Sequence, residues 1–215
     1  MKNNIHLVFD FDGTLVDSFR AAMEKLGLLA DEFNFRKISD NEIDGLRDLT
    51  SQELIKYLEI PIYKISSVLH CARKHMRSEM QGLLPFTNLP ETLHELHGMK
   101  IPLGILTSNS FDNVTEWLKH NKMQHLFNFI HVESSYFGKK RILKKILKAY
   151  KIDKSQAFYI GDETRDVEAA KKCDVYSIAV IWGFNSEKIL SQQQPHFIAK
   201  KPGDILTICE KINNQ

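Results

Sequence analysis

Short apolar runs alternate with segments whose apolar positions recur every three or four residues. The short runs are rich in Val, Ile, Leu and Phe, which is typical of buried strands. We expect strands at Ile5–Asp10, Pro102–Thr107, Phe129–Val132, Ala157–Ile160 and Val175–Ile181. We expect helices at Phe111–Asn121, Lys139–Tyr150 and Thr164–Lys172, and from about Gly203 to Ile212. Strands separated by helices predict a doubly wound α/β fold around a parallel sheet.

The alternation is interrupted once, between residue 17 and about residue 85. This segment shows helical periodicity and no strand pattern. Phe19, Met23 and Leu26 share one helical face, and Leu54 and Leu58 share another with Tyr57. It is too long for an ordinary connection. We therefore expect an α/β core at 1–16 and 86–215, and an inserted helical domain with its own small core at 17–85.

Composition narrows the class of protein. The chain has 215 residues, 43% of them hydrophobic, which is enough for a substantial core. Its net charge of +2 produces no strong field, and no apolar run is long enough to span a bilayer, so we expect neither nucleic-acid nor membrane partners. The acidic residues Asp10 and Asp12 come too early for a secretory signal, which predicts a cytoplasmic protein. The three cysteines predict buried free thiols. Nothing indicates the oligomeric state.

The first predicted strand ends in two carboxylates, Asp10 and Asp12, followed by the turn-forming Gly13 and Thr14. Strand alternation predicts that Asp10 and Asp12 face one small volume at the carboxyl end of the strand. Ligands bind at this end in open α/β sheets. At about 4 Å and an effective dielectric near 20, the repulsion between the two is on the order of 4 kcal/mol. A bound cation, or a proton on one of them, would relieve it.

Further polar residues follow other predicted strands. Thr107 and Ser108 come just before a helix N-terminus, where anions bind well. Asp162 and Asp166 follow the strand at Ala157–Ile160. Both also fit a structural role at the start of the next helix, as a cap or as favourable charge in the first turn. Together the carboxylates predict a Mg²⁺ site, because Mg²⁺ prefers hard oxygen ligands.

Two adjacent lysines, Lys139 and Lys140, begin a predicted helix. The apolar face of this helix contains Ile142, Leu143 and Ile146. Lys139 lies three and four residues before Ile142 and Leu143, so it belongs to the inward face. We therefore expect Lys139 to enter the site and Lys140 to be exposed.

Four motifs in this chain resemble those of the haloacid dehalogenase superfamily. They are Asp-Phe-Asp-Gly-Thr-Leu-Val-Asp-Ser at 10–18, Thr-Ser-Asn at 107–109, Gly-Lys at 138–139 and Gly-Asp-x-x-x-Asp at 161–166. The helical insertion resembles the cap of the phosphoglycolate phosphatase-like and β-phosphoglucomutase-like branch. The resemblance covers nearly the whole chain. It implies a Rossmann-like core, a helical cap and a phosphatase acting on a small phosphate ester.

The resemblance also implies roles for single residues. Asp10 would attack phosphorus and form an aspartyl-phosphate, while Asp12 would protonate the leaving oxygen and then activate water. Mg²⁺ would be held by Asp10, the backbone carbonyl of Asp12, and Asp162. Asp166 would orient a metal-bound water or the lysine. The groups implied for binding the phosphoryl group are Gly13, Thr107, Ser108 and Lys139.

A carboxylate at position 12 favours a phosphate ester as substrate. Haloacid dehalogenases lack one at this place, because their halide leaving group needs no proton, whereas an alkoxide does.

Some alternatives remain open at this stage. Arg47, in the insertion, could bind a second anionic group of the substrate, or it could pair with Asp44 or Asp48. A phosphomutase is the rival enzyme, although the spacing of Gly45 and Arg47 departs from the β-phosphoglucomutase cap pattern and so favours hydrolysis. A non-catalytic phosphometabolite-binding protein is the rival outside enzymes. The four intact motifs favour turnover.

Overall fold

The computed structural model describes residues 5–133 and 138–213. Within these residues, six strands form one parallel sheet in the order β3-β2-β1-β4-β5-β6. The strands are β1 (His6–Phe9), β2 (Leu103–Thr107), β3 (Phe129–Val132), β4 (Ala157–Gly161), β5 (Tyr176–Val180) and β6 (Phe197–Ala199). This is the strand order of a doubly wound Rossmann-like fold. The expected α/β class is confirmed.

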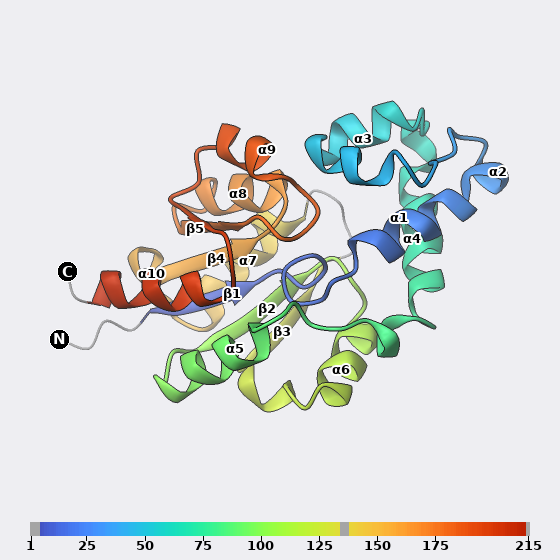
Figure 1. Cartoon of the computed structure of the whole chain (residues 1–215). Coiled ribbons are helices and arrows are strands. Elements are labelled where there is room, and N and C mark those ends of the chain that lie inside the picture. The colour runs from blue at the N-terminus through green and yellow to red at the C-terminus, as the bar shows by residue number, and fades with distance from the viewer. Residues whose placement is uncertain (1–4, 134–137, 214–215) are drawn as a thin grey trace.

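Helices cover both faces of the sheet (Figure 1). One face packs against α5 (Leu89–Gly98), α6 (Phe111–His120) and α10 (Gly203–Asn213). The other packs against α7 (Lys139–Ala149) and α8 (Thr164–Lys171), and the short α9 (Glu187–Gln192) packs beside α8. Residues of β1 alternate between these layers, with Leu7 and Phe9 in the first and Val8 in the second. Burial on both faces explains why the strands are apolar throughout.

The segment between β1 and β2 is helical. Before α5 it contains α1 (Phe19–Leu28), α2 (Ala30–Phe33), η1 (Ile43–Asp48), α3 (Ser51–Tyr57), η2 (Ile62–Lys64), α4 (Ile65–Met76) and η3 (Met80–Gly82). In Figure 1, α1 to α4 stand apart from the sheet and the helices that cover it. Met23, Leu26, Leu58 and Val68 belong to a buried cluster separate from the two layers of the sheet. The insertion thus has its own hydrophobic core.

The structure adds elements that periodicity did not predict, among them β6 and α9. Both are short, and a three-residue strand is too brief to show any alternation. One prediction about cysteines was also wrong in part. Cys173 and Cys209 are buried, but Cys71 on α4 is only half-buried; all three are free thiols. Across the described residues, none of the helices has the length and apolar character needed to cross a membrane.

The strand order reverses at β1, which pairs with β2 on one side and with β4 on the other. The chain leaves β1 toward Asp10 and leaves β4 toward Asp162. In doubly wound sheets the ligand crevice lies outside the carboxyl ends of the strands at such a switch point. The topology therefore brings two acidic residues, distant in sequence, to the position where this fold binds ligands.

Candidate active site

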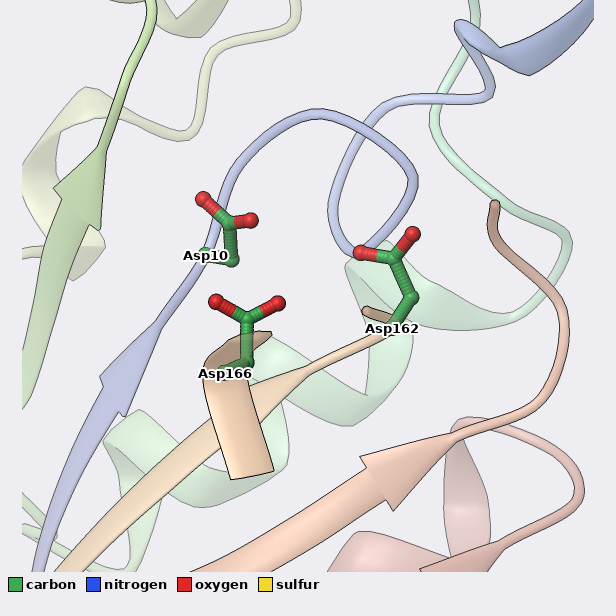
Figure 2. A group of neighbouring side chains, drawn as sticks. All are labelled: Asp10, Asp162 and Asp166. Carbon is green, nitrogen blue, oxygen red and sulfur yellow. The ribbon is translucent and has the colours of Figure 1, made fainter. Parts of the chain in front are cut away.

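Three buried aspartates meet at the carboxyl edge of the sheet. Asp10, Asp162 and Asp166 each offer a carboxylate oxygen, and these three oxygens lie within 4.8 Å of one another. Figure 2 shows the three side chains converging from the end of β1, the end of β4 and the start of α8. Their exposed fractions are 2% or less. Ionised carboxylates that are buried this close together repel one another, so the site needs positive charge nearby.

Lys139, the first residue of α7, supplies one such charge. Its Nζ donates to a carboxylate oxygen of Asp10 and lies 2.6 Å from Oδ1 of Asp166. Its side chain is 4% exposed, whereas Lys140 is exposed. The expected orientation of the two lysines is confirmed. Burial alone would lower the pKa of Lys139, but the charges of Asp10 and Asp166 outweigh it and leave the pKa raised.

The single positive charge of Lys139 does not neutralise the three aspartates. Burial raises the pKa of Asp10 to about 7, although Lys139 opposes this, and the charge of Asp166 adds to the rise. The pKa of Asp162 is also raised well above its ordinary value, first by burial and then by the charges of Asp10, Glu163 and Asp166. A divalent cation would relieve both effects. Three hard oxygen donors at this spacing fit such an ion.

The turn after β1 is built against Asp162. Thr14 donates its hydroxyl proton to Oδ1 of Asp162 at 2.5 Å, and the backbone N–H of Phe184 donates to Oδ2 at 2.7 Å. Gly13 has a φ of +74°, and a Cβ there would lie 2.2 Å from Oδ2 of Asp162. Only glycine therefore allows the turn to approach this carboxylate so closely. We did not predict the contact of Thr14, because it spans 148 positions in the chain.

Asp12 lies two residues after Asp10, and its carboxylate has its own hydrogen-bond partners. β1 ends at Phe9 and the backbone turns after it, so the alternation does not extend to residue 12. The carboxylate of Asp12 accepts from Nδ2 of Asn109 at 2.9 and 3.2 Å, and from the Ser18 hydroxyl at 3.2 Å. Burial raises its pKa, while these hydrogen bonds lower it; the net direction is upward.

Thr107 and Ser108 lie at the end of β2, beside this site. Thr107 is buried, and its Oγ1 accepts from the backbone N–H of Asn109 at 2.9 Å. Oγ of Ser108 lies 3.5 Å from Nη2 of Arg165. Asn109 was seen in the sequence as part of the Thr-Ser-Asn run, but its contact with Asp12 joins two strand ends and was not foreseeable from spacing.

Asp166 holds several groups in place. Oδ1 accepts from Lys139 and, at 3.1 Å, from the hydroxyl of Tyr159, while Oδ2 accepts from the backbone N–H of Glu163. Asp166 therefore both caps α8 and orients Lys139. The two roles considered from the sequence are compatible, because the carboxylate has two oxygens.

The insertion contacts the core close to this cluster. Ser51 at the start of α3 donates to Oε2 of Glu163 at 2.6 Å, and Asn185 donates to the carbonyl oxygen of Leu49 at 2.8 Å. Nη2 of Arg47 donates to the carbonyl oxygen of Ile181 at 2.8 Å. Arg47 thus lies in the contact between insertion and core. Asp48 accepts from Ser186 and Lys188 instead.

Comparison with known proteins agrees with this geometry. Residues 7–180 match the model of a family described as haloacid dehalogenase-like hydrolase. The chain is 28% identical to a phosphoglycolate phosphatase of Synechococcus elongatus, over 97% of this chain and 99% of that protein. It is 23% identical to the pyrophosphatase PpaX of Listeria monocytogenes, over 94% of each. A haloacid dehalogenase-like hydrolase from Streptococcus pneumoniae shares the fold, with a TM-score of 0.79, 24% identity and coverage of 97% and 99%.

Proposed function

Since this chain belongs to the haloacid dehalogenase-like hydrolases and is a phosphatase of that family, we propose that it hydrolyses a small phosphorylated metabolite through an aspartyl-phosphate on Asp10. The observation that supports this most strongly is the buried contact of Asp10 with Lys139 beside Asp162 and Asp166. A nucleophilic carboxylate needs a fixed orientation and a neighbouring cation for the incoming phosphoryl group. Asp10 has both. A covalent intermediate also divides one slow step into two easier ones.

In this proposal Asp12 acts first as the general acid and then as the general base. Its raised pKa favours the protonated form that a general acid needs. Asn109 and Ser18 orient the carboxyl group, and after the first step the same group, now ionised, takes a proton from the attacking water. The alcohol leaves in the first step, when the bond from Asp10 to phosphorus forms and the bond from phosphorus to the leaving oxygen breaks. In the second step, water displaces Asp10 from the aspartyl-phosphate and inorganic phosphate is released.

The family uses a divalent metal, and the donor set described above fits one. We propose Mg²⁺, held by Asp10, Asp162 and the backbone carbonyl of Asp12. When bound, it would neutralise charge on the transferring phosphoryl group. Lys139 supplies further positive charge, and Gly13, Thr107 and Ser108 are proposed to bind the phosphoryl oxygens. Asp166 holds Lys139 in position through the contact at 2.6 Å.

Residues 17–85 are proposed to be a cap, on an α/β core formed by 1–16 and 86–215. Residues 1–4, 134–137 and 214–215 of these ranges lie outside the described part of the chain. The contacts of Ser51 and Leu49 with the core hold the insertion over the site. A covered site excludes bulk water while the phosphoenzyme forms. We keep the role of Arg47 in recognising substrate as a prediction.

We also propose a cytoplasmic location. The three free cysteines support it, because thiols remain reduced in that compartment.

The function is tested by hydrolysis of p-nitrophenyl phosphate with and without Mg²⁺. We expect phosphate release by the unmutated protein with Mg²⁺, none after chelation, and none by Asp10→Asn. Asp174→Asn is the control, since Asp174 lies on the surface and pairs with Lys154. Circular dichroism checks that each variant is folded. Absence of release from a broad panel of phosphate esters at saturating Mg²⁺ would refute the proposal.

A further inference from the structure

A cavity of about 190 Å³ lies between the insertion and the core. Its walls come mainly from α1, α3 and α4, and most of their lining side chains are apolar. They include Ala22, Met23, Leu54, Leu58, Val68 and Ala72. Buried apolar surface of this kind favours a hydrophobic occupant, because water inside it finds few hydrogen-bond partners.

The same cavity opens onto the candidate active site. Asp12, Ser108 and Asn109 line it at one end, beside Arg73 and Arg165. Asp12 is the group proposed to protonate the leaving oxygen, so whatever is attached to that oxygen must lie next to Asp12. The cavity therefore begins where the leaving group of the substrate begins. The part of the substrate that would enter the cavity is therefore its leaving group.

Polarity changes along the cavity. The end at Asp12 carries two guanidinium groups, and Arg165 also pairs with Glu163. The far end, between α1 and α4, is hydrocarbon. Such a gradient matches an ester with an anionic phosphate at one end and an apolar group at the other. An apolar group suits the hydrocarbon part, because a charged group there would lose its hydration without a partner.

We propose that this cavity binds the apolar leaving group of a phosphate monoester, and that the physiological substrate is an ester of a hydrophobic alcohol. This deepens the function proposed above and rests on it. The size is suitable, because a cavity of about 150 Å³ lined by Leu, Ile and Phe holds a benzene molecule. Each methylene that enters should raise kcat/KM about fourfold, from the free energy of burying a methylene.

The test is a series of straight-chain alkyl phosphates from methyl to hexyl, with Mg²⁺. The leaving alcohols have nearly equal basicity, so differences in kcat/KM report burial of the chain. We expect a rise of roughly 60-fold from methyl to butyl phosphate, at about fourfold per methylene, and a plateau once the cavity is full. Butyl phosphate should also exceed phosphoglycolate. A flat or falling series, or phosphoglycolate above butyl phosphate, would overturn the proposal.

Substitutions of lining residues test whether the dependence of kcat/KM on chain length arises in this cavity. Ala22 and Ala72 are half-buried in helices and line it, so Ala22→Leu and Ala72→Leu should lower kcat/KM for hexyl phosphate at least tenfold more than kcat/KM for methyl phosphate. Ala21→Leu is the matched control, because Ala21 is half-buried on the same helix and is not among the lining residues. Leu54→Ala should move the plateau to longer chains. Equal effects of the Ala21 and Ala22 variants would count against the proposal.

A binding measurement separates this proposal from the proposed function. Alkylphosphonates carry the same alkyl groups on a direct carbon–phosphorus bond and resist hydrolysis, so their affinity can be measured by calorimetry whether or not the protein turns over. We expect tighter binding of butylphosphonate than of methylphosphonate. If no ester is hydrolysed but this trend holds, the catalytic proposal fails and the cavity proposal stands. If esters are hydrolysed and the trend is absent, the cavity proposal fails alone.

Discussion

Nζ of Lys139 lies 2.6 Å from Oδ1 of Asp166, in a site where both side chains are buried. The two residues lie in the first turns of successive helices, α7 and α8, on the same face of the sheet. Since Lys139 also contacts Asp10, this ion pair orients a cation that contacts the proposed nucleophile. Removing either partner of a buried ion pair destabilises the folded protein, because the other charge is left buried without its partner.

Replacing Lys139 by methionine should destabilise the protein and abolish turnover. Three carboxylates would then share a dry volume without their cation, and removing one partner of a buried pair costs about 3–5 kcal/mol. We expect the free energy of unfolding in EDTA, measured with urea, to fall by about 3 kcal/mol by the same reasoning, with partial recovery in Mg²⁺. Lys140→Met, at the exposed neighbour, should change it by no more than about 0.5 kcal/mol. Equal losses in both variants would contradict the assignment.

Replacing Asp166 by asparagine should lower activity without abolishing it. The amide keeps the size of the side chain and one acceptor oxygen for Lys139, but loses the charge. Residues that orient metal ligands or their partners typically contribute about 10–100-fold to activity or metal affinity. We expect a decrease of that order in kcat for p-nitrophenyl phosphate. Activity within twofold of the unmutated enzyme would show that Asp166 only caps α8.

Gly13→Ala should weaken both the fold and the metal site. The left-handed conformation costs a non-glycine residue roughly 1–2 kcal/mol, and the added Cβ would displace Asp162 or the ring of Phe184. We expect a lower melting temperature and a smaller increase on adding Mg²⁺, measured by calorimetry. Gly98→Ala is the matched control, because a Cβ at that position would meet no atom within 4 Å. An Mg²⁺ response unchanged by Gly13→Ala would refute the role of this turn.

We expect the free energy of unfolding to be smaller in mild acid because of His196. Nδ1 of His196 accepts from the backbone N–H of Ser177 at 3.1 Å. Burial, with a smaller effect of Lys171, lowers the pKa of His196 below 6.5. The unfolded chain therefore takes up the proton first, and the free energy of unfolding should decrease as the pH falls through 6.5 toward the lower pKa of the folded state.

The test compares urea unfolding at about pH 8 and about pH 5.5, on either side of the ordinary histidine pKa. In His196→Asn, the amide oxygen can replace Nδ1 as acceptor and does not titrate. We expect a shallower dependence on pH in this variant. The remainder would come from the half-buried His6 and His131, whose pKa values are also lowered by partial burial. An unchanged slope would exclude His196 as a contributor.

The strands and the inward face of α7 could be predicted because they depend on local patterns. Buried parallel strands are continuously apolar, and helical periodicity alone distinguishes Lys139 from Lys140. The orientation of Asp12 could not be predicted in the same way. Alternation applies within a strand, and β1 ends at Phe9 before Asp12 is reached.

The amino-acid sequence by itself determined the α/β class, the place of the helical insertion, and the acidic residues that follow β1 and β4. These features follow from periodicity and composition over a few residues at a time. Only the tertiary structure decided which groups touch: Thr14 with Asp162, Asn109 with Asp12, and Ala72 with the cavity beside the site. Such contacts join residues far apart in the chain, and they depend on how strands, helices and insertion pack together. No local pattern encodes that arrangement.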